Sequence, residues 1–373
     1  MVDPHRGLRA WLVASIAAVF LTLMVGGVTR LTESGLSITE WKPISGVFPP
    51  TDSATWQAEY ERFLRIPQAS TTHLGITLDG FKFIFWWEWI HRFLARAVGL
   101  VFAIPYLWLL WRRRIPDGLK LRLASLPLLT LAQGALGWYM VQSGLAERSS
   151  VSSYRLAAHL SLALAILVVA VWTWADLRAL ARRDVADEPP ASDAWRRAML
   201  TLVVAVSVTV VSGAFVAGLR AGEIFNTFPL MGGQVVPPGY AFDGGWMRGA
   251  FEHPIAAQFH HRVLALLTAA LALVMAWRAG RSSRDPLTIG RDGAVIGSAR
   301  PPLTQAAARA IRVVGAVALV QVALGIATLL LSVPVVLGVV HQLTGALLLT
   351  VAVLALHRCR GTNLPTTMQR SVA

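Results

Sequence analysis

The sequence predicts an all-α integral membrane protein, with eight transmembrane helices arranged as two pseudo-symmetric four-helix bundles. Three observations support this fold class: an apolar composition, eight apolar runs of membrane-spanning length, and an internal repeat. Of the 373 residues, 55% are hydrophobic and only 14% are charged, whereas about 25% of the residues of an ordinary soluble domain are charged. With a mean hydropathy of +0.56, the chain has more apolar side chains than a soluble core of this size could bury.

Eight apolar runs approach the length of about 20 residues that crosses a bilayer as a helix. The first run starts almost at Met1 and is not followed by a small-residue cleavage site. We therefore expect a retained span in a bacterial inner (plasma) membrane, and neither a signal peptide nor a mitochondrial transit peptide. The runs cover residues 8–29, 82–110, 121–142, 154–175, 197–219, 255–277, 306–331 and 335–356.

The 34 Lys and Arg residues outnumber the 20 Asp and Glu residues, which gives a net charge of +14. The positive-inside rule places connections that are rich in Lys and Arg in the cytoplasm. Alternate connections hold 22 of the basic residues, so this multi-pass chain should have both termini cytoplasmic. A nucleic-acid partner would instead require a basic patch on a soluble fold. The basic segments are 1–9, 112–122, 178–197, 278–312 and 358–370.

The two halves of the chain resemble each other. Gln133 and Gln321, 188 residues apart, both stand in a Leu-x-Gln-x-Ala-Leu-Gly run, and Gly26-Gly27 and Ser212-Gly213 both precede a long outer loop. Each half has four spans, so the halves share one orientation and should be related by an axis along the membrane normal. The predicted halves are residues 1–180 and 181–373.

Four histidines, one in each even-numbered span, are the strongest candidates for chemistry. His91, His159, His261 and His341 each lie roughly 8–14 Å inside the expected outer boundary, at 1.5 Å per helical residue. A single membrane histidine often does no more than bond to a neighbouring helix, but ionisable groups at four repeat-related positions are costly and indicate function. Paired neutral imidazoles suit axial ligation of haem iron. The lone cysteine, Cys359, excludes a thiolate zinc site.

The halves differ beside the first histidine of each pair. Glu88 precedes His91 by three residues and therefore shares its helix face, whereas Gln258 holds this place before His261. This asymmetry predicts that the first half carries out the chemistry. Alternatively, Glu88 pairs with Arg92 or Arg96. Arg92 and Arg262 would bind haem propionates or, alternatively, outer carboxylates such as Glu33 and Glu40.

Long motifs are similar to those of haem A synthases. The segment Gly26–Pro50 resembles the first outer loop of that family, Phe81–Arg92 resembles its second-span motif, and Gly222–Met231 resembles its second long outer loop. The resemblance extends over nearly the whole chain apart from linkers at about 182–196 and 280–303 and the tail. Some members of the family have a pair of cysteines in the first outer loop. This chain has no such pair, so it resembles the cysteine-free type.

The resemblance implies an oxidoreductase for cytochrome oxidase biogenesis, which oxidises the C8 methyl of haem o to the formyl of haem A with water as the oxygen source. It implies that His91 and His159 hold the substrate haem o with Glu88 catalytic, whereas His261 and His341 hold a haem b (heme b) cofactor. We expect oxidation to leave an electron-deficient carbon that Glu88 stabilises or captures before water adds. Both haem sites should face the outer, periplasmic side.

Membrane lipid and haem o are the expected partners, and no nucleic acid is expected. Pathway order suggests contact with haem O synthase and with oxidase assembly factors, and a homo-oligomer is a further possibility. Two other classes of protein remain open. A di-haem transmembrane cytochrome for electron transfer would also need two histidine pairs, though not a carboxylate in one half only. A transporter with parallel repeats would show broken helices near mid-membrane, and no strong Gly or Pro interruption is present there.

Overall fold

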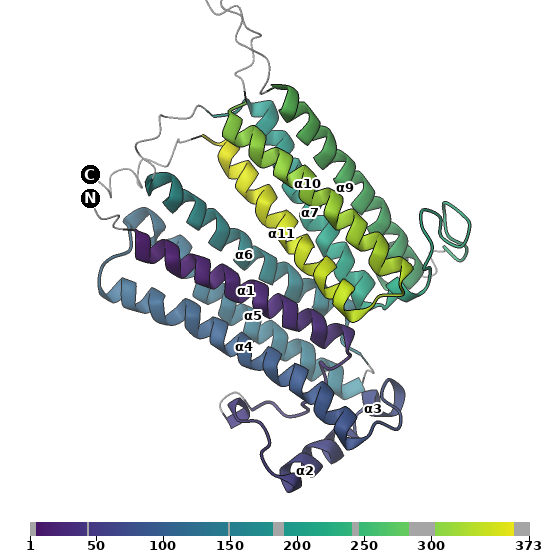
Figure 1. The fold of residues 1–373 in the computed structure, drawn as a ribbon. Helices are drawn as coiled ribbons and strands as arrows, with labels where there is room; N and C mark the ends of the chain where they lie inside the picture. Colours follow the sequence, from purple (N-terminus) through teal and green to yellow (C-terminus); the bar gives the residue numbers. More distant parts are fainter. Residues whose placement is uncertain are drawn as a thin grey trace, which may run out of the picture.

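The computed structural model describes residues 5–42, 45–147, 150–181, 190–240, 246–282 and 303–361. Eight long helices dominate these residues (Figure 1). They are α1 (Arg6–Leu31), α4 (Leu78–Trp111), α5 (Lys120–Glu147), α6 (Ser153–Ala181), α7 (Asp193–Gly218), α9 (Pro254–Ser282), α10 (Gln305–Leu330) and α11 (Val335–Cys359). The remaining elements are short: α2 (Ser53–Phe63), α3 (Pro67–Thr71), α8 (Trp246–Glu252) and the 3₁₀ turns η1 (Ser45–Val47), η2 (Asp117–Leu119) and η3 (Ala221–Glu223).

The all-helical prediction is confirmed, because the only β-pairing among the described residues is an isolated bridge between Met231 and Gln234. Seven of the long helices are long and apolar enough to cross a membrane, so the chain fits a multi-pass membrane protein. The eighth, α5, does not reach that hydropathy. It has the length to span a bilayer, but residues such as Pro127, Gln133 and Tyr139 dilute its apolar character. Its crossing of the membrane stays a prediction.

Each long helix packs mainly on a small set of neighbours. In the first half, α4 and α6 each pack against both α1 and α5; in the second half, α9 and α11 each pack against both α7 and α10. Further contacts join α1 to α11, α6 to α7 and α6 to α11. The helices that carry the candidate histidines are therefore separated, within each group, by the two other helices.

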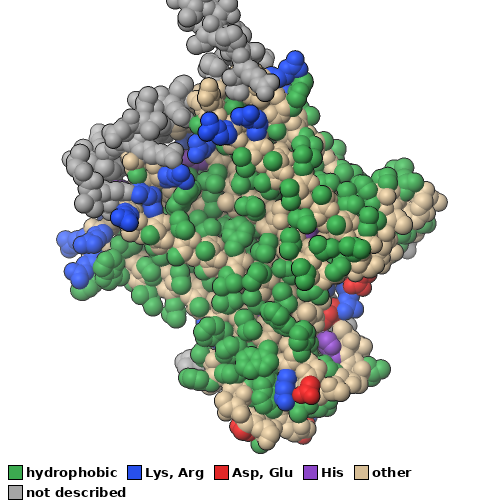
Figure 2. Space-filling model, viewed as in Figure 1, with side chains coloured by type: hydrophobic (Ala, Val, Ile, Leu, Met, Phe, Trp, Pro, Cys, Tyr) green, Lys and Arg blue, Asp and Glu red, His purple; other side chains and the backbone are tan. Residues whose placement is uncertain are grey.

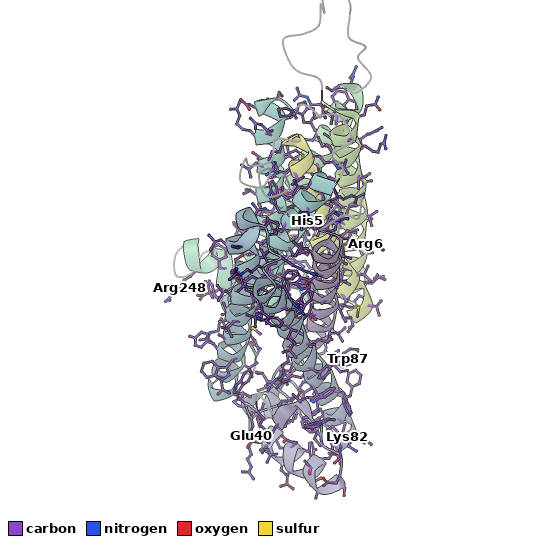
Figure 3. All side chains as sticks on the ribbon, turned by 90° about the vertical axis from the view of Figure 1, so that its left-hand side faces the viewer. His5, Arg6, Glu40, Lys82, Trp87 and Arg248 are labelled. Carbon is purple, nitrogen blue, oxygen red and sulfur yellow. The ribbon has the colours of Figure 1, made fainter. Side chains whose placement is uncertain are left out.

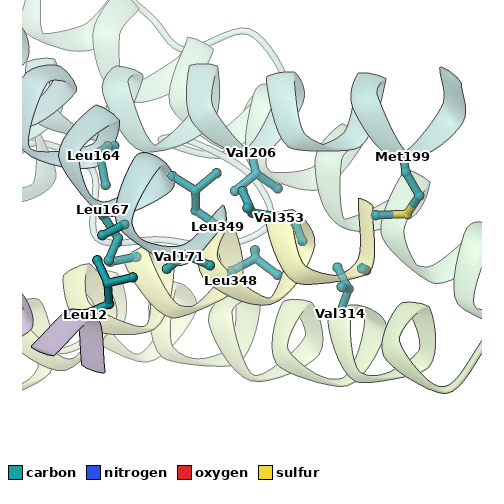
Figure 4. Packing of buried hydrophobic residues seen from close by; sticks show 14 of the residues in the cluster. Leu12, Leu164, Leu167, Val171, Met199, Val206, Val314, Leu348, Leu349 and Val353 are labelled. Carbon is teal, nitrogen blue, oxygen red and sulfur yellow. The ribbon is translucent and has the colours of Figure 1, made fainter. Parts of the chain in front are cut away.

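One hydrophobic cluster runs through helices of both groups (Figure 4). Leu12 of α1, Leu167 of α6 and Leu349 of α11 are almost fully buried in it. Lipid tails are as apolar as these side chains, so close packing rather than exclusion of water must hold the helices together. Small residues allow that packing: a Cβ built at Gly315 of α10 would lie 2.6 Å from the Cβ of Ala276 on α9.

The outer loop after α1 folds into a lobe beyond the end of the helices. Phe63 of α2 packs with Phe81 and Phe85 at the start of α4, so the first turns of α4 belong to this lobe. Glu40 and Lys82 lie at this end of the molecule, and His5 and Arg6 lie farther up, towards the opposite end (Figure 3).

Charge separates the two ends of the helices. On the face shown in Figure 2, most Lys and Arg side chains gather at the end opposite the lobe, the middle is hydrophobic, and the visible acidic side chains lie towards the lobe. This distribution agrees with the expected topology, which stays a prediction. Several basic positions used in that expectation lie outside the described residues: Arg182, Arg183, Arg284, Arg291, Arg300 and Arg370.

A buried ionic cluster ties three helices together at the end opposite the lobe. The fully buried carboxylate of Asp176 on α6 accepts hydrogen bonds from Arg122 of α5 at 2.5 Å and from Arg360 of α11 at 2.6 Å. His357 of α11 lies 2.8 Å from the same carboxylate through Nε2. Such charge-assisted bonds are stronger than neutral ones, and α11 thereby joins the first group of helices to the second.

We expect Asp176→Ala to destabilise the protein by about 2–4 kcal/mol, because it leaves two arginines without their buried counter-ion. We expect a smaller loss of stability than for a wholly buried ion pair, because 31% of the Arg122 side chain and 24% of the Arg360 side chain are exposed. The thermal unfolding midpoint in detergent, followed by circular dichroism, measures the loss. Asp193→Ala is the control, because Asp193 pairs with Arg196 at the surface, and the loss of an exposed pair should shift the midpoint much less. Equal shifts in the two variants would contradict this role of Asp176.

Candidate functional site

Each of the four histidines lies against a glycine of the preceding long helix. A Cβ built at Gly26 of α1 would lie 2.9 Å from Cε1 of His91, and one at Gly213 of α7 would lie 3.0 Å from Cε1 of His261. The second histidine of each half repeats this contact. The corresponding distances are 3.2 Å for Gly137 and His159, and 2.8 Å for Gly325 and His341. Any larger residue at these positions would press on the imidazole ring.

The glycines therefore direct all four rings in the same way. Because α4 and α6 both pack on α1 and α5, the helices of His91 and His159 stand diagonally in the first group, and the two side chains are close enough to interact electrostatically. The helices of His261 and His341 stand diagonally in the second group, where the two histidines interact in the same way. The structure thus brings together the two histidines of each predicted pair.

The two ring nitrogens of these histidines have different surroundings. Among the described residues, Nδ1 of His91, His159 and His341 is buried without a hydrogen-bond partner, whereas Nδ1 of His261 lies 2.8 Å from the hydroxyl of Ser212. No Nε2 atom of the four histidines is either hydrogen-bonded or buried in the part of the chain that the structure describes. The accessible nitrogen is therefore Nε2 in every case, which is a suitable donor for an axial bond to haem iron.

The donor set fits a haem better than a bare metal ion. Among the described residues, no group of three or more His, Cys, Asp or Glu side chains could hold a metal ion. Two imidazoles on diagonal helices provide two ligands with nothing to complete a tetrahedral site, whereas two axial ligands complete the coordination of a haem iron whose other four bonds come from the ring itself. Cys359 is buried in the core and is not part of either pair.

Glu88 is almost fully buried, and both of its carboxylate oxygens are hydrogen-bonded. Oε1 accepts from Arg92 at 2.6 Å and 3.0 Å, and Oε2 accepts from the hydroxyl of Ser37 at 2.7 Å and from the amide of Ile38 at 2.8 Å. The pairing of Glu88 with Arg92, which the sequence left as an alternative, is therefore present. It holds the start of the outer loop onto α4, one helical turn before His91.

The same clamp exists in the second half without the carboxylate. Arg92 donates to the carbonyl of Ile38 at 2.8 Å, and Arg262 donates to the carbonyls of Phe225 and Thr227, each at 2.7 Å. Gln258 donates to Phe225 at 3.2 Å. In both halves, the residues three before and one after the histidine thus fasten an outer loop over the helix group. Arg92 and Arg262 already have protein partners, and any contact with propionates stays a prediction.

The other outer-side residues named from the sequence also have partners. Arg30 forms an ion pair with Glu33 at 3.1 Å, and Glu33 in turn accepts from Arg220 at 2.5 Å. Arg96 donates to the carbonyl of Lys42 at 3.1 Å. His260, to which the sequence assigned no role, lies 2.9 Å from the hydroxyl of Tyr240 through Nε2. These contacts fasten loops to helices and do not join the histidine pairs.

The structure corrects one register of the internal repeat. The sequence comparison pairs Gly26-Gly27 with Ser212-Gly213, which makes Ser212 the counterpart of Gly26. The contacts instead match Gly26 with Gly213, since both touch the first histidine of their half, and Ser212 then matches Val25. Sequence reasoning missed the function of these glycines, although Gly137 and Gly325 end the repeated motif that it identified.

Fold and site together define a multi-span helical membrane protein with two repeat-related pairs of half-buried histidines. A family model described as cytochrome oxidase assembly protein matches residues 9–353. The chain is also 43% identical to a "Heme A synthase" of Sphingopyxis alaskensis, over 96% of this chain and 93% of that protein. Proteins of the same name from Rhodopseudomonas palustris (strain HaA2) and Caulobacter sp. (strain K31) are 41% and 43% identical, over 95% and 94% of this chain and 90% and 95% of those proteins. The chain belongs to this family of cytochrome oxidase assembly proteins.

We expect Arg92→Ala to release the outer loop from α4. Arg92 holds the carbonyl of Ile38 directly and neutralises the carboxylate that binds the Ile38 amide. Loss of even one such charge-assisted bond, worth about 1.5–3 kcal/mol, should speed amide hydrogen exchange in residues 34–42 by about tenfold or more. Hydrogen–deuterium exchange followed by mass spectrometry in detergent measures the exchange rate of these amides. Lys82→Ala, which removes an exposed pair with Asp79 and a cation–π contact with Trp56, is the control. Unchanged exchange in the Arg92 variant would show that the clamp does not hold the loop.

Proposed function

We propose that this protein is a haem A synthase, an oxidoreductase that converts the C8 methyl of haem o to a formyl group. In each of two rounds the carbon would lose two electrons and one proton and gain the hydroxyl of a water molecule, whose other proton is released; a one-electron acceptor would take the electrons one at a time. The geminal diol formed in the second round loses water to give the aldehyde. The observation that carries the proposal is the repeated pair of imidazoles with accessible Nε2 atoms, in a chain whose relatives are named Heme A synthase.

The proposed assignment gives the first half the substrate and the second half the cofactor. His91 and His159 would hold haem o, and His261 and His341 would hold a haem b, which supplies a one-electron redox centre when bound. The glycine contacts support both pairs equally, because they leave room for the rings and fix the direction in which Nε2 points. Only the neighbours of the histidines distinguish the halves, as Glu88 and Gln258 show.

The proposed architecture is two four-helix bundles with eight membrane crossings. The packing of α4 and α6 on α1 and α5, matched by α9 and α11 on α7 and α10, supports it. Each histidine lies in the first half of its helix, and the opposite ends of these helices are basic. This supports the proposal that all four lie on the outer side of a bacterial inner membrane, with both termini in the cytoplasm. Contact with haem O synthase or oxidase assembly factors, and assembly into a homo-oligomer, remain part of the proposal.

Glu88 is the proposed catalytic carboxylate, and its contacts define what it must do. Four hydrogen bonds hold its two oxygens in place, and two of them come from the Arg92 guanidinium, at 2.6 Å and 3.0 Å. A carboxylate beside the reacting carbon would stabilise positive charge that develops there, or capture that carbon before water adds. To do either, Glu88 must give up at least one of the bonds to Ser37, Ile38 or Arg92. The amide of Gln258 carries no charge and lacks this ability.

A di-haem transmembrane cytochrome is the second candidate, since two histidine pairs would serve electron transfer equally well. Such a protein usually places its haems near opposite membrane faces, whereas His91, His159, His261 and His341 all lie near the same ends of their helices. A cytochrome would also not need a buried carboxylate beside the histidine of one half only. Extraction and separation of the bound haems distinguishes the two candidates, because a cytochrome would hold haem b alone.

We expect Glu88→Gln to abolish most haem A formation, with a fall of about 10²-fold or more, as when a charge-stabilising group is removed from an active site. Glu88→Ala should accumulate haem o or a hydroxylated intermediate. Chromatography of haems extracted from the purified variants measures both. Glu59→Gln is the matched control, because Glu59 is a buried carboxylate paired with Arg62 in the lobe, away from the histidines. Normal haem A content in the Glu88→Gln variant would exclude the role.

We expect Gly137→Val to weaken haem binding in the first half. A Cβ at this position lies 3.2 Å from the His159 ring, so valine would displace a proposed ligand, and affinity should fall by about tenfold or more. Haem per protein, from the pyridine haemochrome spectrum, measures the loss. Gly134→Val on the same helix is the control, because a Cβ there meets nothing within 4 Å. Equal haem contents in the two variants would contradict the proposed ligation by His159.

A further inference from the structure

The residue that precedes the histidine-contacting glycine differs between the halves. Gly26 and Gly213 occupy equivalent places, because each lies about 3 Å from Cε1 of the first histidine of its half. The preceding residues, Val25 in α1 and Ser212 in α7, are therefore counterparts. Valine has no hydrogen-bonding group in its side chain, whereas serine has one, and both positions lie beside a proposed haem ligand.

Ser212 fixes which nitrogen of His261 carries a proton. Its hydroxyl lies 2.7 Å from the carbonyl of Thr209 and 2.8 Å from Nδ1 of His261. A carbonyl can only accept, so the single hydroxyl proton goes to Thr209, and Nδ1–H of His261 donates to the Ser212 oxygen. This is the one arrangement in which both contacts are hydrogen bonds. It leaves Nε2 without a proton, in the form that binds iron.

The first half has no such arrangement. Val25 offers no acceptor, and Nδ1 of His91 is buried without a hydrogen-bond partner among the described residues. The hydroxyl-bearing residue nearest to Val25 along α1 is Thr22, and its hydroxyl donates to the carbonyl of Ala18 in the same helix. The ring of His91 thus lies against Gly26 without a hydrogen bond at Nδ1 among the described residues, while that of His261 lies against Gly213 and is also held by a hydrogen bond.

We propose that Ser212 is a positioning residue that makes His261 a permanent haem ligand, and that Val25, at the equivalent place, leaves His91 able to release its haem. This inference rests on the proposed function, in which one half keeps a cofactor and the other exchanges substrate for product. A hydrogen bond at Nδ1 restrains the ring and makes Nε2 a stronger donor, and removal of such a partner typically weakens metal binding about 10- to 100-fold.

The test uses the full-length protein, purified in detergent with the haems that it acquires in the expression host. Ser212→Val gives the second half the residue that the first half has at this position, and Ser212→Ala removes the hydroxyl without adding volume. In both variants we expect transfer of the half-two haem to excess apomyoglobin, followed in the Soret band, to become about tenfold faster. The reduction potential of that haem should rise, because a weaker donor stabilises the ferric state less.

Two controls separate this effect from general damage to the helix. Ser212→Thr keeps the hydroxyl and should retain the wild-type rate and potential. Ser207→Val makes the same substitution on the same helix, where the hydroxyl only donates to the carbonyl of Val203 at 2.8 Å, and should change neither.

The reciprocal variant tests the other half of the proposal. Val25→Ser places a hydroxyl beside His91, where the glycine contact has nearly the same geometry as at His261. We expect the half-one haem to leave about tenfold more slowly, so that more haem o or haem A stays with the purified protein.

The outcomes distinguish this inference from the function on which it rests. If the wild-type protein binds no haem, the proposed function is wrong and the inference falls with it. If it binds haem, but Ser212→Val and Ser212→Ala release it at the wild-type rate with an unchanged potential, the inference alone is overturned. Faster release in the Ser207→Val control would also overturn it, because the effect would then not depend on the hydrogen bond to His261.

Discussion

The constraint on which the rest of the structure depends is the burial of imidazole rings between helices that pack through glycine. A ring as large as imidazole fits between neighbouring helices only where the facing residue has no side chain, and Gly26, Gly137, Gly213 and Gly325 meet that need. The contact fixes both the spacing of the helices and the direction of the ring. It also explains why each histidine-bearing helix packs on the glycine-bearing helix before it, as α4 does on α1 and α11 on α10.

The outer loops depend on these same helices. The residues that flank each first histidine reach up to the loop that follows the preceding glycine-bearing helix, through Arg92 to Ile38 and through Arg262 to Phe225. A carbonyl bonded by a guanidinium loses little by leaving water, so the loop can lie over the end of the bundle without unsatisfied backbone groups. Movement of either loop would therefore disturb the turn of helix that carries the histidine, and the loops and the histidines should be regarded as one unit.

The sequence predicted the long helices well, because an apolar run bounded by charges is a local signal. Every predicted run lies within a few residues of an observed helix, yet the early turns of α4 were not predicted to belong to the lobe, since Phe81 and Phe85 look like membrane residues and contact Phe63 only in the folded chain. The histidine pairs were predicted from their repeat. The Arg92–Glu88 bond was predicted as an alternative because it joins neighbouring helical turns. The contacts that Glu88 and Arg92 make with Ser37 and Ile38 join segments that are far apart in the chain, and so do the contacts of the cluster at Asp176. Such contacts leave no local pattern in the sequence.

Under the proposed function, the two halves of one scaffold serve opposite requirements. A cofactor site must hold its haem for the life of the protein, whereas a substrate site must release a nearly identical molecule after each reaction. The backbone cannot provide this difference, because the glycine contacts of His91 and His261 are almost the same. We therefore expect the difference in side chains near the rings, and two of the positions that differ there in chemistry are Glu88 against Gln258, and Val25 against Ser212. A hydrogen bond to a ligand imidazole is worth about tenfold in metal affinity at the lower end of its usual range, which corresponds to about 1.4 kcal/mol. Such a small term separates retention from release only if the ligand bonds themselves are balanced between the two halves, and the shared geometry of the four histidines is what provides that balance.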